Sequence, residues 1–574
     1  MLSFKITYFT CFCMWMSLFS RSAAEVFTAI SDVEPLIETH QRIINDVNEY
    51  IAAEETRLST LKKRLKLYKE EHEMAMADIP NYLANPINAF TLIKRLTKDL
   101  EKIRQLSQIG TENSNIIAKN HEDLKYPVLE DLTGAAEALT RLQETYELNV
   151  QDLSEGLLNG VVYSKPMSAG DCFEIGKALY EEGDYNNSLA WMTEAVRKYS
   201  EKDELSDFRV IDFYEYIALS HYYLGDTKSA LHWTERIVEL EPEHQHGPGN
   251  IILYQKIIAE KEAKKLNGEV EEDQTPKPPM FDDEYEKELQ NYKPLCRGEL
   301  QVPGVISKRL KCRYLTENHP FLKLAPIKME YHYLQPDLIV FHDVMSDDEI
   351  EFIKATAQPR FRRAGTRSGE NGASVPSKYR ISKSAWLEDS ESPVIARVSQ
   401  RVADMTGLNM NTAEELQVVN YGIGGHYEPH YDFARKHENL INYRNAGNRI
   451  GTVLFYMSDV AQGGATVFTK LGVSLFPIKG AAAFWYNLHP SCEGDLATRH
   501  AACPVLRGSK WVSNKWIHQG GQELLRPCGL QYQEEGVSRR IPKPILKTSS
   551  PGCQGVLLNT PQKGTNFTRM PKAN

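Results

Sequence analysis

A histidine and an aspartate stand two positions apart, at His430 and Asp432, in a segment whose residues indicate an extended strand. In a strand this spacing places both side chains on one face. An imidazole and a carboxylate side by side supply two ligands of a 2-His-1-carboxylate iron(II) site, which keeps positions open for dioxygen and a cosubstrate. The third ligand must come from elsewhere, and His500 is the candidate.

A lysine follows the distal histidine in sequence, at Lys510. A lysine near the metal, among apolar and aromatic side chains, would need an anion, and a dicarboxylate cosubstrate that chelates iron at one end would supply it. The alternative is a solvent-facing lysine, because most lysines lie on the surface.

The residues that must position this site form short apolar runs divided by Gly, Pro and Asp. Such a pattern predicts an all-β sandwich or jelly roll. A flanking helix is predicted over 346–357, where Ser346 is the N-cap and Glu349 completes a capping box. The predicted strands cover 338–341, 416–421, 452–457, 473–476, 481–486 and 511–513.

The first part of the chain is predicted to be helical, with helices over 37–68, 88–106 and 135–148. The 37–68 stretch carries a heptad pattern, which indicates a coiled coil and self-association. A long amphipathic helix packed on its own domain is the alternative, because His40 and Glu54 interrupt one seam position. The other seam position holds Ile37, Ile44, Ile51, Leu58 and Leu65.

An internal repeat follows, in which residues 176–184 are echoed at 218–226 and Trp191 and Trp233 keep the same offset. The pattern predicts tetratricopeptide-like helix pairs. The region is rich in tyrosine, whose flat rings suit an extended polyproline peptide. The alternative is that individual rings fill the space between helices. The tyrosines are Tyr180, Tyr185, Tyr214, Tyr216, Tyr222, Tyr223 and Tyr254.

The composition fits a multidomain globular protein of 574 residues with a net charge of -10, which argues against a nucleic-acid partner. Residues 1–24 are predicted to be a secretory signal peptide. A membrane anchor is the weaker alternative, because the apolar run is too short to span a bilayer comfortably. No later stretch is long and apolar enough to span a bilayer. Asn186 and Asn566 are glycosylation acceptors if exposed.

Eight motifs stand out in the sequence, at 85–90, 171–176, 380–386, 415–436, 455–459, 463–468, 484–487 and 499–505. They closely resemble the α subunits of collagen prolyl 4-hydroxylases, and the resemblance runs from about residue 26 to 528. It implies an iron(II) and 2-oxoglutarate dioxygenase that hydroxylates proline to 4-hydroxyproline in X-Pro-Gly repeats of procollagen. Dioxygen is then the oxidant, and L-ascorbate restores oxidised iron.

The resemblance also implies roles for individual residues. The iron ligands carry over to His430, Asp432 and His500, and the 2-oxoglutarate contacts to Lys510, Tyr421 and Thr452. Positions near the substrate proline match Tyr427 and Trp516, and the peptide-binding positions match Tyr216, Tyr222 and Asn250. His246 and Leu253 depart from the family pattern in the peptide-binding region, so the preference among proline-rich peptides is expected to differ.

By the same resemblance, disulfides join Cys296 to Cys312 and Cys503 to Cys528, and Cys172 is a buried thiol. Cys492 is outside the family pattern and either pairs with Cys553 or stays free. The implied assembly is a tetramer of two α subunits and two protein disulfide isomerase (β) subunits in the endoplasmic reticulum lumen. Self-association would use the N-terminal domain.

The expected architecture is a multidomain α+β chain: signal peptide 1–24, helical dimerisation domain 25–165, tetratricopeptide-like peptide-binding domain 166–262 and linker 263–298. A catalytic double-stranded β-helix (jelly roll) with flanking helices follows at 299–528, then a disordered basic tail at 529–574. Two other functions compete: a secreted binding module with an inactive barrel, and a hydroxylase of lysine or of non-collagen proline-rich proteins. The intact set of His430, Asp432, His500 and Lys510 argues against the first, and the tyrosine-rich repeats favour proline over lysine.

Overall fold

The computed structural model describes residues 35–108, 129–200, 208–266, 283–367, 374–376, 379–436, 446–534 and 543–546. They fall into two compact units, one with residues 35–73 and 99–108 and the other with the rest. The predicted signal peptide, Asn566 and Cys553 lie outside the described residues. Within these ranges, no helix is both long and apolar enough to cross a bilayer.

The first unit contains most of helix α3 (Pro35–Ala77), 43 residues long, together with α6 (Leu100–Gln108). Arg57 on α3 donates a hydrogen bond to the Leu106 carbonyl of α6 at 2.9 Å. The predicted helix is therefore present. One seam position of its heptad is exposed in this chain, because Ile51, Leu58 and Leu65 each keep about half of their surface.

The second unit begins with α4 (Ile79–Leu83) and α5 (Pro86–Lys94), after which the π-helix η2 (Arg95–Asp99) runs into α6. Then come α8 (Leu129–Tyr146), α9 (Val150–Ser154) and the hairpin of β1 (Leu157–Leu158) and β2 (Val161–Val162). α8 packs on α5 and α10 around one apolar core that includes Leu139, Leu142 and Phe173. The predicted helices over 88–106 and 135–148 are confirmed in type.

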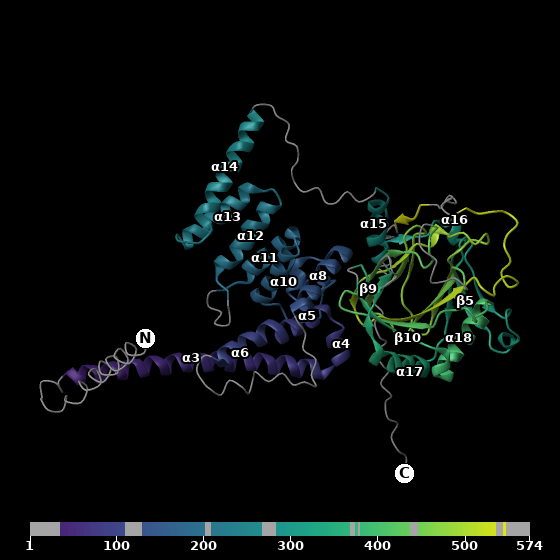
Figure 1. The fold of residues 1–574 in the computed structure, drawn as a ribbon, viewed down its shortest axis with the longest axis horizontal. Helices are drawn as coiled ribbons and strands as arrows, with labels where there is room; N and C mark the ends of the chain where they lie inside the picture. The colour runs from purple at the N-terminus through teal and green to yellow at the C-terminus, as the bar shows by residue number, and fades with distance from the viewer. Residues whose placement is uncertain are drawn as a thin grey trace, which may run out of the picture. The chain divides into compact units, whose positions relative to one another are not determined.

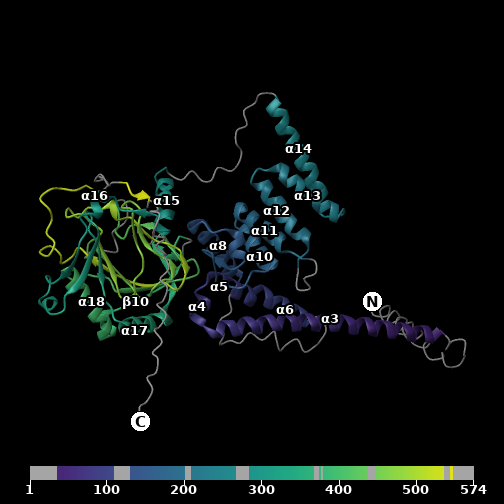
Figure 2. The ribbon, with the colours of Figure 1, turned by 180° about the vertical axis from the view of Figure 1, so that it is seen from behind.

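The repeat folds as helix pairs that stack in order (Figure 1, and from behind in Figure 2). Its repeated Gly-Asp has a local cause. Gly183 and Gly225 adopt φ of +83° and +85°, which ends each first helix, and Asp184 and Asp226 then cap the next helix by accepting a backbone N–H. The helices are α10 (Ala169–Glu181), α11 (Tyr185–Lys198), α12 (Val210–Tyr223), α13 (Thr227–Leu240) and α14 (Gly247–Leu266).

The C-terminal part is built from two antiparallel sheets that pack face to face. The large sheet has the order β4-β5-β6-β17-β13-β20-β11-β10-β7, and the small sheet has the order β12-β18-β15-β16. Phe468 of the small sheet packs edge-on against Trp485 of the large one. The large-sheet strands are β4 (Cys312–Leu315), β5 (Ile327–Tyr333), β6 (Leu338–His342), β7 (Arg362–Arg363), β10 (Ser382–Leu387), β11 (Leu416–Tyr421), β13 (Arg449–Tyr456), β17 (Ala482–Tyr486) and β20 (Trp511–His518).

The small sheet consists of β12 (Tyr427–His430), β15 (Thr466–Phe468), β16 (Val473–Leu475) and β18 (His500–Ala502). Two further pairs form separate two-stranded sheets: β14 (Gln462–Gly463) with β19 (Val505–Arg507), and β8 (Gly365–Arg367) with β9 (Ser374–Pro376). The β-rich class is confirmed. Apolar residues of both sheets, among them Leu454, Phe468 and Val473, form a common core between them.

Two helices cover the other face of the large sheet: α17 (Asp347–Ala357) and α18 (Pro393–Thr406). Ile350 and Val398, one from each helix, are fully buried in one core with sheet residues such as Val418. α17 begins with the predicted capping box of Ser346 and Glu349. Short helical turns lie at Gly304–Ser307 (α16), Pro320–Lys323 (η3), Gln358–Arg360 (η4), Asp389–Glu391 (η5) and Leu496–Thr498 (η7).

Two segments differ from their sequence predictions. The 263–298 linker contains helix α15 (Asp283–Cys296), whose Tyr292 and Leu295 are buried against β15 and β18; few apolar residues and an internal proline hid it. The 529–574 tail is not disordered at 543–546, because β21 (Ile545–Leu546) pairs with β3 (Leu300–Gln301). That pairing satisfies the backbone of an otherwise exposed edge strand.

Candidate metal centre

Three side chains that the sequence analysis singled out converge in the second unit, between the two sheets. His430 ends β12, Asp432 follows it, and His500 begins β18 directly opposite His430 in the antiparallel register. Asp432 lies 3.6 Å from the Nε2 atoms of both histidines. Their potential ligand atoms all lie within 4.8 Å of one another, the only such group of three or more His, Cys, Asp or Glu side chains found in the described residues. Two imidazoles and one carboxylate on one side of a cavity fit iron(II) with open positions.

Both histidines are oriented by the backbone. The Nδ1 atom of His430 lies 2.7 Å from the Glu428 carbonyl, and that of His500 lies 2.9 Å from the Thr498 carbonyl. A carbonyl only accepts, so each Nδ1 carries the proton and each Nε2 lone pair points to the metal position. Each partner lies two residues before its histidine, in β12 for Glu428 and in the helical turn η7 for Thr498, so both contacts are local in sequence.

The electrostatics favour metal binding over protonation. Burial and the neighbouring His500 lower the pKa of His430 to about 3. Burial alone would raise the pKa of Asp432, but His500, His430 and Arg449 outweigh it and lower the value to about 2. At neutral pH His430 is therefore a neutral imidazole and Asp432 a carboxylate, the forms that coordinate a metal.

Asp432 is held from behind by a chain of hydrogen bonds. The Thr452 hydroxyl donates to its Oδ2 at 2.8 Å, and the Asn487 amide donates to the Thr452 oxygen at 3.0 Å. Thr452 is buried and is not among the residues that line the cavity. Its contact is thus with the iron carboxylate, and its predicted contact with the cosubstrate stays a prediction.

Lys510 projects into the same cavity from the large-sheet side. Among the described residues its amine has no hydrogen-bond partner, and the residue is 1% exposed, with the Nζ 4.9 Å from the centre of the Tyr421 ring. Burial lowers its pKa to about 7. A buried amine without a partner is costly unless an anion reaches it. The alternative of a solvent-facing lysine is therefore wrong.

The cavity opens between aromatic and basic side chains. Tyr427 stacks on His430 with ring centroids 3.5 Å apart. The Arg380 guanidinium carbon lies over the Tyr427 ring, 4.7 Å from its centre. Trp516 lines the wall, with the Arg449 guanidinium 3.9 Å from its ring. The full lining comprises Arg380, Tyr421, Tyr427, His430, Asp432, Leu454, Thr466, Trp485, His500, Ala501, Ala502, Lys510, Val512, Asn514 and Trp516.

Sequence reasoning missed the polar network behind Trp516. Arg449 pairs with both oxygens of Glu414 and also donates to the Asp432 carbonyl at 3.3 Å. His518 lies 2.9 Å from Glu414, whose pKa falls to about 2 because these two partners outweigh its burial. The residues of this network come from three strands or loops that are distant in sequence, so no spacing pattern predicts it. Only their charge in otherwise apolar strands was a signal.

Comparison with known proteins identifies the family of the chain. Residues 29–160 match the prolyl 4-hydroxylase α-subunit N-terminal region, 169–260 the prolyl 4-hydroxylase peptide-substrate-binding domain and 416–518 the 2OG-Fe(II) oxygenase superfamily. Prolyl 4-hydroxylase subunit alpha-1 of Rattus norvegicus is 44% identical over 514 residues, which is 88% of this chain and 96% of the relative. The chain belongs to the prolyl 4-hydroxylase α-subunit family. Subunit alpha-1 of Gallus gallus (44%, 89% of this chain, 100% of the relative) and subunit alpha-2 of Caenorhabditis elegans (44%, 89% and 94%) agree.

For a prolyl 4-hydroxylase α subunit, the tyrosines of the second matched region are the next feature of interest. They contact one another across α10 to α14: Tyr185 stacks on Tyr223 at 4.5 Å, and Tyr222 lies 5.1 Å from Tyr254. Tyr254 is buried and fills the space between helices, whereas Tyr223 is 45% exposed. The space-filling interpretation thus holds for Tyr254, and peptide binding by the exposed rings stays a prediction.

The predicted peptide-binding residues lie on the same helices. Tyr216 packs edge-on against Tyr180 at 5.1 Å, and burial raises its pKa to about 12. Asn250 lies in the first turn of α14 and is half-buried. Of the two departures from the family pattern, His246 precedes α14 and Leu253 lies on it, and both are exposed. Exposed positions are free to contact a ligand.

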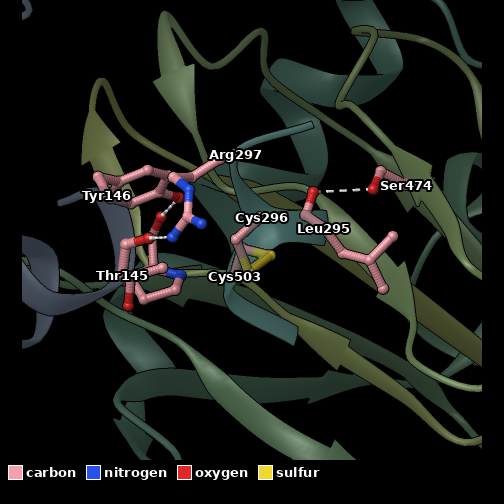
Figure 3. The surroundings of a disulfide bond; sticks show 8 residues. Thr145, Tyr146, Leu295, Cys296, Arg297, Ser474 and Cys503 are labelled. Carbon is pink, nitrogen blue, oxygen red and sulfur yellow. Dashed lines mark hydrogen bonds between the residues drawn. A yellow bond between two sulfur atoms is a disulfide. The ribbon is translucent and has the colours of Figure 1, made fainter. Parts of the chain in front are cut away.

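The cysteine pairing of this α subunit differs from the prediction. Cys296, at the end of α15, is bonded to Cys503 (Figure 3). Both are buried in one cluster with Ala465 and Ala501, whereas Cys312 lies exposed on the edge strand β4. Among the described residues, Cys312, Cys528 and Cys492 are exposed and have no disulfide partner, and Cys172 is a buried thiol as expected; whether Cys492 pairs with Cys553 lies outside the described residues. The predicted pairs 296–312 and 503–528 are therefore wrong in this structure, because α15 brings Cys296 to β18.

Proposed function

We propose that this chain is the catalytic α subunit of a collagen-type prolyl 4-hydroxylase. It hydroxylates proline to 4-hydroxyproline in X-Pro-Gly repeats, coupled to oxidative decarboxylation of 2-oxoglutarate by dioxygen. The observation that carries the proposal is the buried triad of His430, Asp432 and His500 beside the unpaired, buried amine of Lys510. An iron ligand set and an anion site in one cavity match the two ends of 2-oxoglutarate.

The protein's part in the reaction follows from these residues. Iron(II), when bound by His430, Asp432 and His500, supplies the activation of dioxygen. Lys510 binds the distal carboxylate and so fixes the orientation of the cosubstrate, with Tyr421 beside it. The apolar walls, among them Leu454, exclude water from the reacting centre. Thr452 and the two backbone carbonyls keep the ligands in place.

The substrate proline is proposed to enter between Tyr427 and Trp516, whose flat rings suit a pyrrolidine ring. The Arg380 guanidinium lies over the Tyr427 ring and that of Arg449 over the Trp516 ring, and these contacts help to hold the two aromatics in position. The tyrosine-bearing helices α10 to α14, with Tyr216, Tyr222 and Asn250, bind a further stretch of the proline-rich chain. Two binding regions on one long substrate raise its effective concentration at the iron.

The wider assembly is part of the proposal. Family membership and the proposed secretory route support a tetramer with two protein disulfide isomerase subunits in the endoplasmic reticulum lumen, with ascorbate as reductant and Asn186 glycosylated. The exposed seam residues Ile51, Leu58 and Leu65 support self-association through a coiled coil of α3. The facing sheets support assignment of the catalytic domain to the double-stranded β-helix, or jelly-roll, class.

The test uses the full chain coexpressed with a protein disulfide isomerase. Incubation with (Pro-Pro-Gly) repeats, iron(II), ascorbate and labelled 2-oxoglutarate should release carbon dioxide in proportion to 4-hydroxyproline formed. A lysine-containing collagen peptide without proline in the X-Pro-Gly frame is the matched control and should give neither product. Absence of 4-hydroxyproline with an iron-loaded protein would refute the proposal.

A further inference from the structure

Helix α8 lies against both segments of the barrel that lead to and from the iron ligands. The first is the loop 422–426, which enters β12 and so His430; the second is the turn 503–505, which leaves β18 and so His500. The Val505 N–H donates to the Gly425 carbonyl at 3.1 Å, which joins the two segments to each other. A helix that contacts both segments would therefore fix the positions of both strands, β12 and β18, that carry the histidines.

The first contact is made by Arg141 of α8. Its guanidinium donates to the Gly424 carbonyl at 3.2 Å, over a gap of 283 residues in sequence. Gly424 has a φ of +52°, and a Cβ there would stand 3.0 Å from the Ala138 carbonyl and 3.1 Å from the Ala138 Cβ. The loop backbone therefore rests directly on the helix, at a position where only glycine fits without strain.

The second contact is made by Tyr146, the last residue of α8. Its buried hydroxyl donates to the Pro504 carbonyl at 2.5 Å (Figure 3). Gly463 of the neighbouring strand β14 leaves room for the Tyr146 hydroxyl because it has no side chain. A Cβ at this position would stand only 2.5 Å from the hydroxyl oxygen. Burial raises the pKa of Tyr146, so the hydroxyl keeps the proton that it donates.

The apolar packing is continuous across this contact. Ile423 of the loop and Leu506 after the turn belong to the helical core, together with Leu139 and Leu142 of α8. Tyr146 packs against that core and also against the cluster around the Cys296–Cys503 bond. The two iron strands are thus supported by a helix outside the catalytic sheets.

We propose that Arg141 and Tyr146 are positioning residues for the iron site, acting through the loop 422–426 and the turn 503–505; this inference rests on the proposed iron(II) function. Neither touches the ligands. They fix the backbone from which His430 and His500 project, so that their loss lets the strands shift and loosens the metal geometry. α8 also packs on α10, which makes it the physical link between the peptide-binding helices and the iron strands.

The test is metal binding by Arg141→Met and Tyr146→Phe in the full chain purified with its disulfide isomerase partner. Iron(II) affinity is measured by anaerobic equilibrium dialysis without peptide, and uncoupled 2-oxoglutarate decarboxylation is measured per hydroxylation event. Each variant should bind iron about tenfold more weakly, the size found when outer-shell partners of a metal site are lost. Uncoupled decarboxylation should rise as well.

The matched control is Arg297→Gln, which removes a hydrogen bond of similar length, 2.9 Å, from Arg297 to the Thr145 carbonyl of the same helix end. Within the described residues its hydrogen bonds and ion pairs go to Thr145, Glu147 and Glu299 and to neither iron-flanking segment, so the iron affinity of this variant should equal that of the native chain even if its unfolding temperature falls. Arg141→Lys should restore part of the affinity, because an ammonium still donates to the Gly424 carbonyl. Native iron affinity in Tyr146→Phe, which removes one oxygen and folds most readily, would overturn the proposal, as would an equal loss in Arg297→Gln.

Discussion

Replacing Lys510 by methionine should stabilise the protein while destroying its cosubstrate site. The amine is buried without a partner, and its pKa is about 7 instead of 10.5. In the unfolded chain the amine stays protonated up to about pH 10.5. The difference of roughly 3.5 pKa units, at about 1.4 kcal/mol each, corresponds to about 5 kcal/mol lost by the cosubstrate-free fold at neutral pH.

The pH dependence has a definite sign. Below about pH 7 both states bind the proton and the full penalty applies. Between about pH 7 and 10.5 only the unfolded state binds it, so the stability of the native chain rises with pH. Lys510→Met removes both the penalty and this slope, because its unbranched apolar chain occupies similar space. We expect a gain of about 2 to 5 kcal/mol near pH 7, the upper figure being the full pKa-derived penalty.

The assay is denaturant or thermal unfolding of native and Lys510→Met proteins, with and without 2-oxoglutarate, across this pH range. 2-Oxoglutarate should stabilise the native protein and have little effect on the variant, whose KM for it should rise steeply. Lys510→Gln is a useful companion, because it retains polarity without charge. If Lys510→Met unfolds earlier than the native protein, keeps its pH slope and is stabilised equally by 2-oxoglutarate, the reasoning on the buried amine is wrong.

Further predictions concern the ligands, their support and self-association. His500→Ala should leave the purified protein without iron and without peptide-dependent carbon dioxide release, whereas a native metal content would remove His500 from the ligand set. Thr452→Val should weaken iron binding about 10–100-fold in equilibrium dialysis, because Asp432 loses the donor at 2.8 Å; unchanged binding would mean that the hydroxyl is dispensable. Leu58→Glu should lower the sedimenting mass of the assembly by disrupting the seam, while activity per chain on a short peptide persists; an unchanged mass would place the association elsewhere.

The iron site could be predicted from the sequence because histidine, aspartate and lysine side chains have distinctive chemistry. In the structure β12 ends at His430, just before Asp432, whereas His500 begins β18 and Lys510 directly precedes β20. Residue type and spacing in the sequence therefore indicated the site more than strand position did. The structure places these four side chains around one cavity. The helical repeat was also predictable, since Gly-Asp has the same local function at each occurrence, ending one helix and capping the next.

Other features depend on contacts that local sequence does not encode. The Arg449–Glu414 pair joins residues 35 positions apart, and Tyr146 meets Pro504 across 358 positions. The partner of Cys296 is decided by where α15 packs, and that helix was hidden by its low apolar content. Short strand β21 is too brief for any periodicity. Tertiary packing, and not propensity, determines all four.

The way in which His430 and His500 are held has a consequence for how the site tolerates change. Each ring is fixed by a main-chain carbonyl, at residues 428 and 498, and every amino acid possesses that group. Side-chain substitution at these two positions therefore leaves the orienting acceptor intact. The orientation of both imidazoles therefore depends on the path of the main chain and not on which side chains stand at these two positions.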